Sequence, residues 1–209
     1  MSSPGWLKPL IEATSDLDGE ALSQFRPPDS GGRHSAVLIL FGEQDERPDV
    51  LLIERAPDMR SHAGQPAFPG GAVDPEDRGP VEAALREAQE ETGLDPAGVH
   101  VIHALPEIWL PPSGFVVTPV LAWWAEPSPV AVVDANEVSQ VHRVPLAELI
   151  DPANRVTVRH PSGYLAPGFA VHGMLVWGFT ALLLDRILSL ADWEQPWDAG
   201  RIVEVGWTG

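Results

Sequence analysis

The sequence of 209 residues contains no cysteine. Disulfide bonds and thiolate metal sites are therefore excluded, and a reducing compartment is compatible with the chain. Long hydrophobic runs are also missing. The most apolar stretch, residues 174–184, ends at Asp185 and is much shorter than the roughly 20 residues that a membrane-spanning helix needs. The N-terminus lacks the basic start and apolar run of a signal peptide. We therefore expect a cytoplasmic protein without membrane contact.

Basic residues are scarce. The chain has 13 Lys and Arg against 30 Asp and Glu, which gives a formal net charge of −17. Such a charge opposes nonspecific binding to nucleic-acid backbones, so we expect no nucleic-acid partner. If the substrate is an anion, local cations must offset this field. With 44% hydrophobic residues, the chain is long enough to bury a core and is predicted to form one domain.

Strand and helix patterns alternate along the chain. Two apolar runs, 35–41 and 50–53, predict central strands joined by an acidic turn at 43–49. Further strands are expected at 99–110, 115–124, 138–144 and 156–158, and helices at 6–25, 80–92, 145–150 and 174–190. Pro80 suits the first turn of its helix and Gly93 suits the left-handed stop. The pattern predicts an α/β (α+β) fold with a mixed sheet and helices on both faces.

The helix at 80–92 carries three acids in an unfavourable arrangement. Glu87, Glu90 and Glu91 are spaced at i, i+3 and i+4, where like charges repel, and they lie near the end at which the helix dipole disfavours them. A bound cation would turn this repulsion into ligation. Carboxylate oxygens favour hard cations, Mg²⁺ or Mn²⁺ rather than Zn²⁺. The spacing alone leaves open the alternative of a solvated acidic face.

Positive charge gathers just before this helix. Arg55, Arg60 and His62 fall in an irregular, polar stretch that ends at the Gly70-Gly71 pair. Arginine binds phosphate groups bidentately, so this stretch is a candidate for gripping an anionic substrate. The other interpretation is that these residues are solvated loop charges or partners of nearby acids.

The segment 71–94 resembles the Nudix hydrolase box, G-x5-E-x7-R-E-U-x-E-E-x-G-U, where U is a bulky apolar residue. Residues 86–94 match the second half with REAQEETGL. The first half departs from the pattern. Counting from Gly71, the acid is Asp77 rather than Glu, and one extra residue separates it from Arg86. This departure leaves the role of Asp77 open.

A second segment is similar to the signature of the coenzyme A pyrophosphatase subgroup, L-L-T-x-R-S-x3-R-x3-G-x3-F-P-G-G. The matching residues are 51–56 (LLIERA), Arg60, Gly64 and 68–71 (FPGG), with Ile53 and Ala56 at the positions that differ. Residues 176–181 (VWGFTA) also resemble the late helix of that subgroup. The resemblance covers residues 34–190.

The resemblance implies a Nudix-type α/β/α sandwich. It divides the single domain, residues 1–209, into an N-terminal accessory segment (1–33), the Nudix core (34–190) and a C-terminal tail (191–209). It also implies hydrolysis of the pyrophosphate of coenzyme A or its derivatives to 3′,5′-ADP and 4′-phosphopantetheine, with Mg²⁺ or Mn²⁺ as cofactor.

Site residues follow from the same resemblance. Its metal ligands would be Glu87, Glu90, Glu91 and the Gly71 carbonyl, with Glu87 and Glu91 as the leading pair. The catalytic set would be Glu91, Glu90, Arg86, which orients a neighbouring glutamate, and Glu137, an acid from a later loop. Substrate binding would fall to Arg55, Arg60, Gly70 and Gly71.

Two other functions remain open from the sequence. One is a Nudix diphosphatase for ADP-ribose, NADH or a nucleoside triphosphate, and the other is a nucleotide-binding Nudix module that does not catalyse. In each case the partner is a small molecule. A homodimer through an edge strand or the Trp123-Trp124 segment is also left open. Trp177 and Phe179 are interpreted as packing the late helix, with a role in a pocket as the alternative.

Overall fold

The computed structural model describes residues 3–17, 22, 31–57, 63–111 and 113–206. Arg60 and His62, both singled out in the sequence, lie outside the described residues. The elements are η1 Gly5–Leu7, α1 Lys8–Thr14, β1 Arg33–Gln44, β2 Arg47–Arg55, β3 Pro66–Ala67, β4 Gly70–Ala72, α3 Pro80–Thr92, η2 Pro96–Gly98, β5 Val99–Ala104, β6 Ile108–Leu110, β7 Phe115–Trp124, β8 Val138–Pro145, α4 Leu146–Ile150, η3 Pro152–Asn154, β9 Arg155–Arg159, β10 Leu165–Val171, β11 Met174–Val176, α5 Gly178–Leu190 and β12 Ile202–Glu204. No helix among the described residues is long and apolar enough to cross a membrane.

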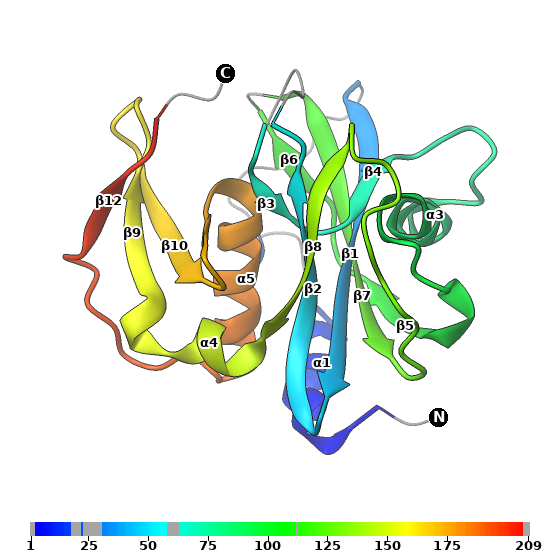
Figure 1. Cartoon of the computed structure of the whole chain (residues 1–209), viewed down its shortest axis with the longest axis horizontal. Helices are drawn as coiled ribbons and strands as arrows, with labels where there is room; N and C mark the ends of the chain where they lie inside the picture. The colour runs from blue at the N-terminus through cyan, green and yellow to red at the C-terminus, as the bar shows by residue number, and fades with distance from the viewer. Residues whose placement is uncertain (1–2, 18–21, 23–30, 58–62, 112, 207–209) are drawn as a thin grey trace.

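A mixed sheet of eight strands forms the centre of the molecule. Its main path runs β3-β2-β1-β7-β5, while β4 pairs with β1, β6 with β7 and β8 with β2. Strands β1 and β7 are parallel and the other pairs are antiparallel. Helix α3 covers one face, and α1 and α5 lie on the other (Figure 1). The predicted mixed α/β fold is therefore confirmed.

Strand β1 is buried on both faces, as its continuous apolar character predicts. Leu38 and Leu40 pack toward α3, whereas Ile39 and Phe41 pack toward α5. The β1–β2 turn is tighter than the predicted 43–49, because strand pairing continues to Gln44 and Arg47. Its two central residues, 45 and 46, have φ of 52° and 60°. Positive φ at both positions matches the twist of a two-residue hairpin.

Helix α3 has the predicted limits. Pro80 occupies its first turn, and Gly93 ends it with φ of 70° while donating its N–H to the carbonyl of Gln89. Small residues on one side, among them Ala84 and Ala88, are fully buried against the sheet. Because alanine adds so little bulk, the helix axis comes close to the strands. The helix can therefore present its acids directly to β4.

Three predicted elements were wrong in extent. The helix expected at 6–25 ends at Thr14, where residues 15 and 16 form a turn; residues 18–21 and 23–25 lie outside the described part of the chain. The strand expected at 99–110 is split into β5 and β6, because residues 105–107, with Pro106, leave the ladder. Apolar periodicity gave no sign of either break.

The helix expected at 174–190 begins only at Gly178. Residues 174–176 form β11 and pair with β10 instead. The backbone of Trp177 is extended, and Gly178 has φ of 66°, so the chain reorients before the helix starts. A continuous apolar run is compatible with a buried strand as well as a buried helix, and here it contains both.

A second sheet, β11-β10-β9-β12, was not predicted. It lies on the side of α5 away from the central sheet (Figure 1). Strand β12 comes from the segment expected as a tail and pairs in parallel with β9. The late apolar helix thus lies between two sheets, which explains why most of its residues are apolar and buried.

Arg155 links this second sheet to its surroundings. Its side chain is 2% exposed, forms an ion pair with Asp185 of α5 and lies 3.7 Å from Glu194. The guanidinium also stacks on the rings of Phe169 and Trp197, at 4.5 and 4.6 Å from their centroids. Strand β9, helix α5 and the C-terminal segment therefore share one buried cation.

We predict that Arg155→Ala destabilises the protein by about 3 to 5 kcal/mol, because it leaves Asp185 beside a cavity without its cation. The matched control is Arg159→Ala on the same strand. Arg159 pairs with Glu204, but the two side chains are 41% and 77% exposed, so its loss should cost less than about 1 kcal/mol. Urea unfolding measures both changes. Equal losses of unfolding free energy would mean that Arg155 contributes no more than an exposed ion pair.

Candidate active site

The Gly70-Gly71 turn lies in direct contact with β1 and α3. A Cβ on Gly70 would lie 2.2 Å from the carbonyl oxygen of Ala36, and one on Gly71 would lie 2.4 Å from the carboxyl carbon of Glu87. A side chain is therefore excluded at Gly70, where the clash is with backbone, and at Gly71 it would displace the Glu87 carboxylate. Gly70 also has φ of 155°, which disfavours other residues. The two glycines thus allow the backbone of β4 to reach the acids of the helix.

Glu91 is the acid most enclosed by this contact. Its residue is 4% exposed, and Oε2 accepts a hydrogen bond of 2.9 Å from the Gly70 N–H. The pKa of Glu91 is raised to about 7, chiefly by burial and also by the carboxylates of Glu87 and Glu137, against the opposing effects of Gly70 and Arg55. The alternative of a solvated acidic face therefore does not hold at Glu91, which is buried.

Glu87 and Glu90 are both held by Arg86. Arg86 Nη1 donates to Glu87 Oε1 at 2.9 Å and to Glu90 Oε2 at 3.2 Å. Burial raises the pKa of Glu87, although the Arg86 guanidinium opposes this effect. The Glu90 side chain is 59% exposed. The repulsion expected among the acids is thus partly offset within the helix, and Glu90 lies toward solvent.

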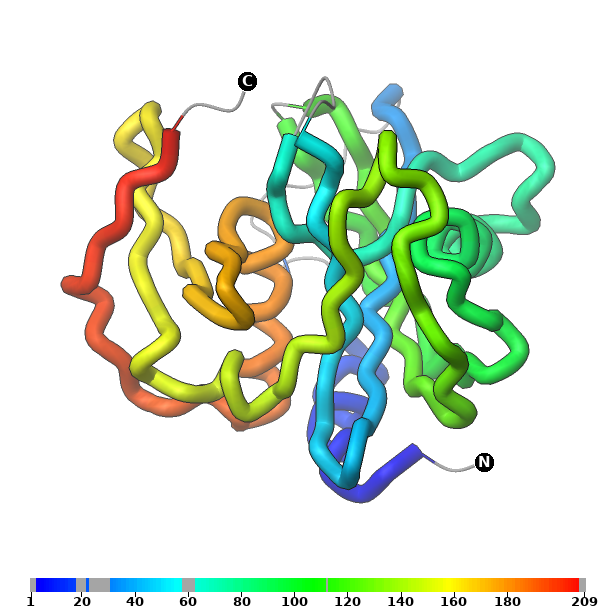
Figure 2. Tube along the Cα trace, in the orientation of Figure 1, coloured from blue at the N-terminus to red at the C-terminus, as the bar shows by residue number. Residues whose placement is uncertain are grey.

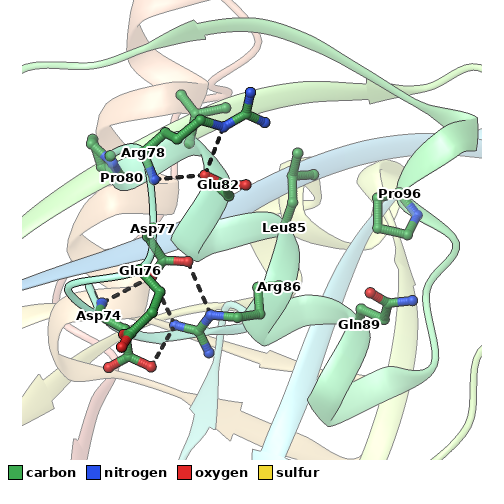
Figure 3. A pocket seen from close by; sticks show the side chains of 12 residues that line it. Asp74, Glu76, Asp77, Arg78, Pro80, Glu82, Leu85, Arg86, Gln89 and Pro96 are labelled. Carbon is green, nitrogen blue, oxygen red and sulfur yellow. Dashed lines mark hydrogen bonds and ion pairs between the residues drawn. The ribbon is translucent and has the colours of Figure 1, made fainter.

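Arg86 is in turn fixed by Asp77. Its Nε and Nη2 donate to the two carboxylate oxygens of Asp77 at 3.1 and 3.0 Å (Figure 3). Nη2 also donates to the carbonyl of Ala72 at 3.1 Å. The Asp77 side chain is only 4% exposed. Hydrogen bonds from Arg86 lower the pKa of Asp77, so it remains a carboxylate. This bidentate contact orients the guanidinium toward Glu87.

The extra residue between Asp77 and Arg86 is accommodated before the helix begins. Residues 73–79 form a loop that projects outward between β4 and α3 (Figure 2). Within it, Asp74 N–H donates to Asp77 Oδ2 at 2.8 Å, and Asp77 N–H donates to the Asp74 carbonyl at 3.1 Å. The turn brings the shorter Asp side chain to Arg86. A hollow beside this loop and the outer side of Arg86 (Figure 3) is lined by neither Glu87 nor Glu91.

A later loop brings Glu137 to the same place. Ala131 and Val133 donate their N–H groups to the carbonyls of Thr92 and Glu91, at 2.9 and 3.4 Å, at the C-terminus of α3. These bonds satisfy carbonyls that the helix leaves unpaired. At the other end of the loop, the Glu137 carbonyl accepts the N–H of Ala56 at 2.9 Å. Glu137 is exposed and its charge acts on Glu91.

Arg55 lies beside these acids. Its positive charge lowers the pKa of Glu91, and its side chain is half-buried. The Nε–H of Arg55 is buried and has no hydrogen-bond partner among the described residues. The guanidinium therefore has donor capacity left for an anion. Arg60 lies outside the described residues, so only one of the two proposed arginines can be placed.

The residues fit a hard divalent cation in part. Among the described residues, no three acidic or histidine side chains are grouped closely enough to hold a metal ion by themselves. Glu87, Glu90 and Glu91 thus do not converge on one point. Two of them do lie against the glycine turn: Glu87 lies where a Cβ on Gly71 would be, and Glu91 accepts the N–H of Gly70. Two carboxylates and a backbone carbonyl suit Mg²⁺ or Mn²⁺, which complete their shells with water and substrate oxygens.

Comparison with known proteins agrees with this geometry. The family model described as NUDIX domain matches residues 32–163. The chain belongs to the Nudix hydrolase family. A relative from Cronobacter sakazakii, "Uncharacterized Nudix hydrolase NudL", is 40% identical over 171 residues, covering 78% of this chain and 85% of the relative. A relative of the same name from Klebsiella pneumoniae strain 342 is 45% identical over 171 residues, with the same coverage of both chains.

A solved structure shows the same fold. The Nudix hydrolase RenU from M. smegmatis aligns over 78% of this chain and 88% of its own, with a TM-score of 0.55 and 22% identity. Nudix hydrolases generally use divalent metal ions such as Mg²⁺ or Mn²⁺. The chain is accordingly a Nudix hydrolase that acts on a pyrophosphate-containing substrate.

We predict that Asp77→Asn lowers kcat/KM and weakens activation by Mg²⁺, each by about 10- to 100-fold, because the amide cannot hold Arg86 through two acceptors. Asp74→Asn is the matched control. Asp74 Oδ2 lies 3.5 Å from Arg86 Nη2 and its side chain is 56% exposed, so this variant should resemble the wild type. Steady-state kinetics across a Mg²⁺ titration measure both. Equal behaviour of the two variants would contradict the role given to Asp77.

Proposed function

We propose that this Nudix hydrolase cleaves the pyrophosphate of coenzyme A or its thioesters, releasing 3′,5′-ADP and 4′-phosphopantetheine or its acyl form. One observation carries the proposal. The segment 51–71, which resembles the coenzyme A pyrophosphatase signature, supplies Arg55, Gly70 and Gly71 around the buried carboxylate of Glu91. Both motifs thus contribute to one site.

The backbone of this segment supports the proposal. Arg55 donates its N–H to the Gln65 carbonyl at 3.1 Å, and its own carbonyl accepts the Gly64 N–H at 3.2 Å. Gly64 has φ of 66°, a conformation that favours glycine. The described residues that follow the 58–62 stretch are therefore held at Arg55, which precedes it.

The chemistry we propose follows from the placed side chains. A cation held by Glu87, Glu91 and the Gly71 carbonyl would neutralise charge on the phosphates and acidify a water molecule. Arg55 would donate hydrogen bonds to a phosphate oxygen and fix the pyrophosphate. Glu137, exposed beside Glu91, would accept the proton of the attacking water as the bond between phosphorus and the bridging oxygen breaks. Arg86 would keep Glu87 in position.

We predict that Glu91→Gln and Glu87→Gln each reduce Mg²⁺-dependent release of 3′,5′-ADP from coenzyme A by at least about 100-fold, because each removes charge that would hold the cation. Glu82→Gln is the matched control, since Glu82 lies on the same helix and pairs with the exposed Arg78. Chromatography of the products measures the release. Activity in either site variant at the level of the control would contradict the assignment, provided thermal melting shows an intact fold.

Substrate choice needs a separate experiment. We expect kcat/KM for coenzyme A to exceed the values for ADP-ribose, NADH and nucleoside triphosphates at the same Mg²⁺ concentration. A clear preference for one of these would replace coenzyme A while leaving the metal site intact. Binding without turnover in both Mg²⁺ and Mn²⁺ would instead indicate a module that does not catalyse.

We predict that Arg55→Ala raises KM for coenzyme A by about 10- to 100-fold, the scale of one or two hydrogen bonds to a charged group. Arg55→Lys should recover only part of the loss, because an ammonium cannot bind phosphate in a bidentate fashion. Arg78→Ala serves as the control, since Arg78 is exposed and pairs with Glu82. An unchanged KM in Arg55→Ala would remove this residue from the substrate site.

A further inference from the structure

Trp177 is an unusually placed aromatic residue. It lies between β11 and α5 and is half-buried. Phe179, two residues later, packs against the main hydrophobic core, whereas Trp177 belongs to neither core cluster formed by the described residues. No hydrogen bond to its indole N–H is found among the described residues. Of the two residues expected to pack the late helix, Phe179 thus packs against a core cluster and Trp177 does not.

A second planar ring faces Trp177. The imidazole of His160 lies 6.4 Å from it, centroid to centroid, with 38° between the planes. Ser162 holds this imidazole, because its N–H donates to His160 Nδ1 at 3.1 Å and its hydroxyl lies 2.8 Å from the same nitrogen. Tyr164, at the same end of the β9–β10 hairpin, is 56% exposed. Large aromatic surface is thus left outside the core on two adjoining segments.

The chain path connects this aromatic surface to the catalytic turn. Strand β11, which ends just before Trp177, lies against β3. Strand β3 pairs with Ile53 and Glu54, next to Arg55, and leads within a few residues to Gly70. A substrate whose pyrophosphate contacts Arg55 and Gly70, and which extends past β3, would therefore reach β11 on the α5 side of the central sheet.

Because the protein carries a large negative charge, stacking is better suited than charge attraction to bind the part of the substrate that extends beyond the pyrophosphate. With a net charge of −17, the protein repels anionic nucleotides at long range. Stacking of a base on an aromatic side chain does not depend on net charge, and its loss on alanine substitution weakens binding by about 5- to 150-fold. Tryptophan offers the largest ring for this contact, and its free N–H can meet an acceptor at the ligand edge.

We propose that Trp177, backed by His160, is the stacking surface for the nucleobase of the substrate. The identity of that base as adenine rests on the proposed function. The site determines which nucleotide end is accepted, and it is separate from the groups that hold the cation and the pyrophosphate.

Equilibrium binding of adenosine 3′,5′-bisphosphate tests this proposal without turnover. By calorimetry, Trp177→Leu should weaken binding by about ten- to a hundredfold, and Trp177→Tyr should restore most of it because it returns an aromatic ring. Trp109→Leu is the matched control, since Trp109 is also half-buried and lies on β6. Ribose 5-phosphate, which lacks a base, should show a much smaller difference between wild type and Trp177→Leu.

A measurement on the wild-type protein covers the case in which Trp177→Leu does not fold. In protein labelled with ¹⁹F-tryptophan, the resonance that Trp177→Phe removes should shift when adenosine 3′,5′-bisphosphate is added. An unshifted resonance, equal affinities of wild type and Trp177→Leu, or no binding by the wild type would overturn the proposal. Binding that depends on Trp177 in a protein that does not hydrolyse coenzyme A would sustain the stacking site and reject the proposed substrate.

Discussion

The close approach of the Gly70-Gly71 turn to α3 is the contact on which the rest of the site depends. It requires two residues without side chains on β4 and a helix whose inner side is mostly alanine. Together they place the Gly70 N–H on the Glu91 carboxylate and the Gly71 backbone against Glu87. A methyl group at Gly70 would meet the Ala36 carbonyl of β1, and one at Gly71 would meet the Glu87 carboxylate. Either substitution would therefore disturb the contact between the turn and its neighbours.

Around this contact, each acid is controlled by a different neighbour. Glu91 is buried, Glu87 is held by Arg86, and Glu90 remains at the solvent side of the same guanidinium. Asp77 supports Arg86 from a loop that is one residue longer than the family pattern. The shorter acid and the longer loop compensate one another, because a turn between residues 74 and 77 carries the carboxylate to the guanidinium. Despite this departure from the motif, an acid at residue 77 still binds Arg86.

The two sheets carry different groups of side chains. The central sheet holds the acids and Arg55, while the second sheet, joined through Arg155 and α5, carries the hairpin end with His160 and Tyr164. Trp177 lies where α5 begins, between them. The same reorientation at residues 177–178 that ends β11 keeps this ring out of the core. Its position is therefore a result of how β11 gives way to the helix.

The sequence alone determined the limits of α3, the two central strands and the identity of the family motif, because proline, glycine and continuous apolar runs act locally. It also identified Arg55 and Glu137 as candidate site residues, but not their positions in the fold. Only the tertiary structure decided that Glu91 is buried, that Asp77 holds Arg86 and that residues 174–176 form a strand. Those outcomes depend on neighbours distant in the chain. Carbonyls at the end of α3 meet a loop some forty residues later, and β11 meets β10, and no local pattern encodes such partners.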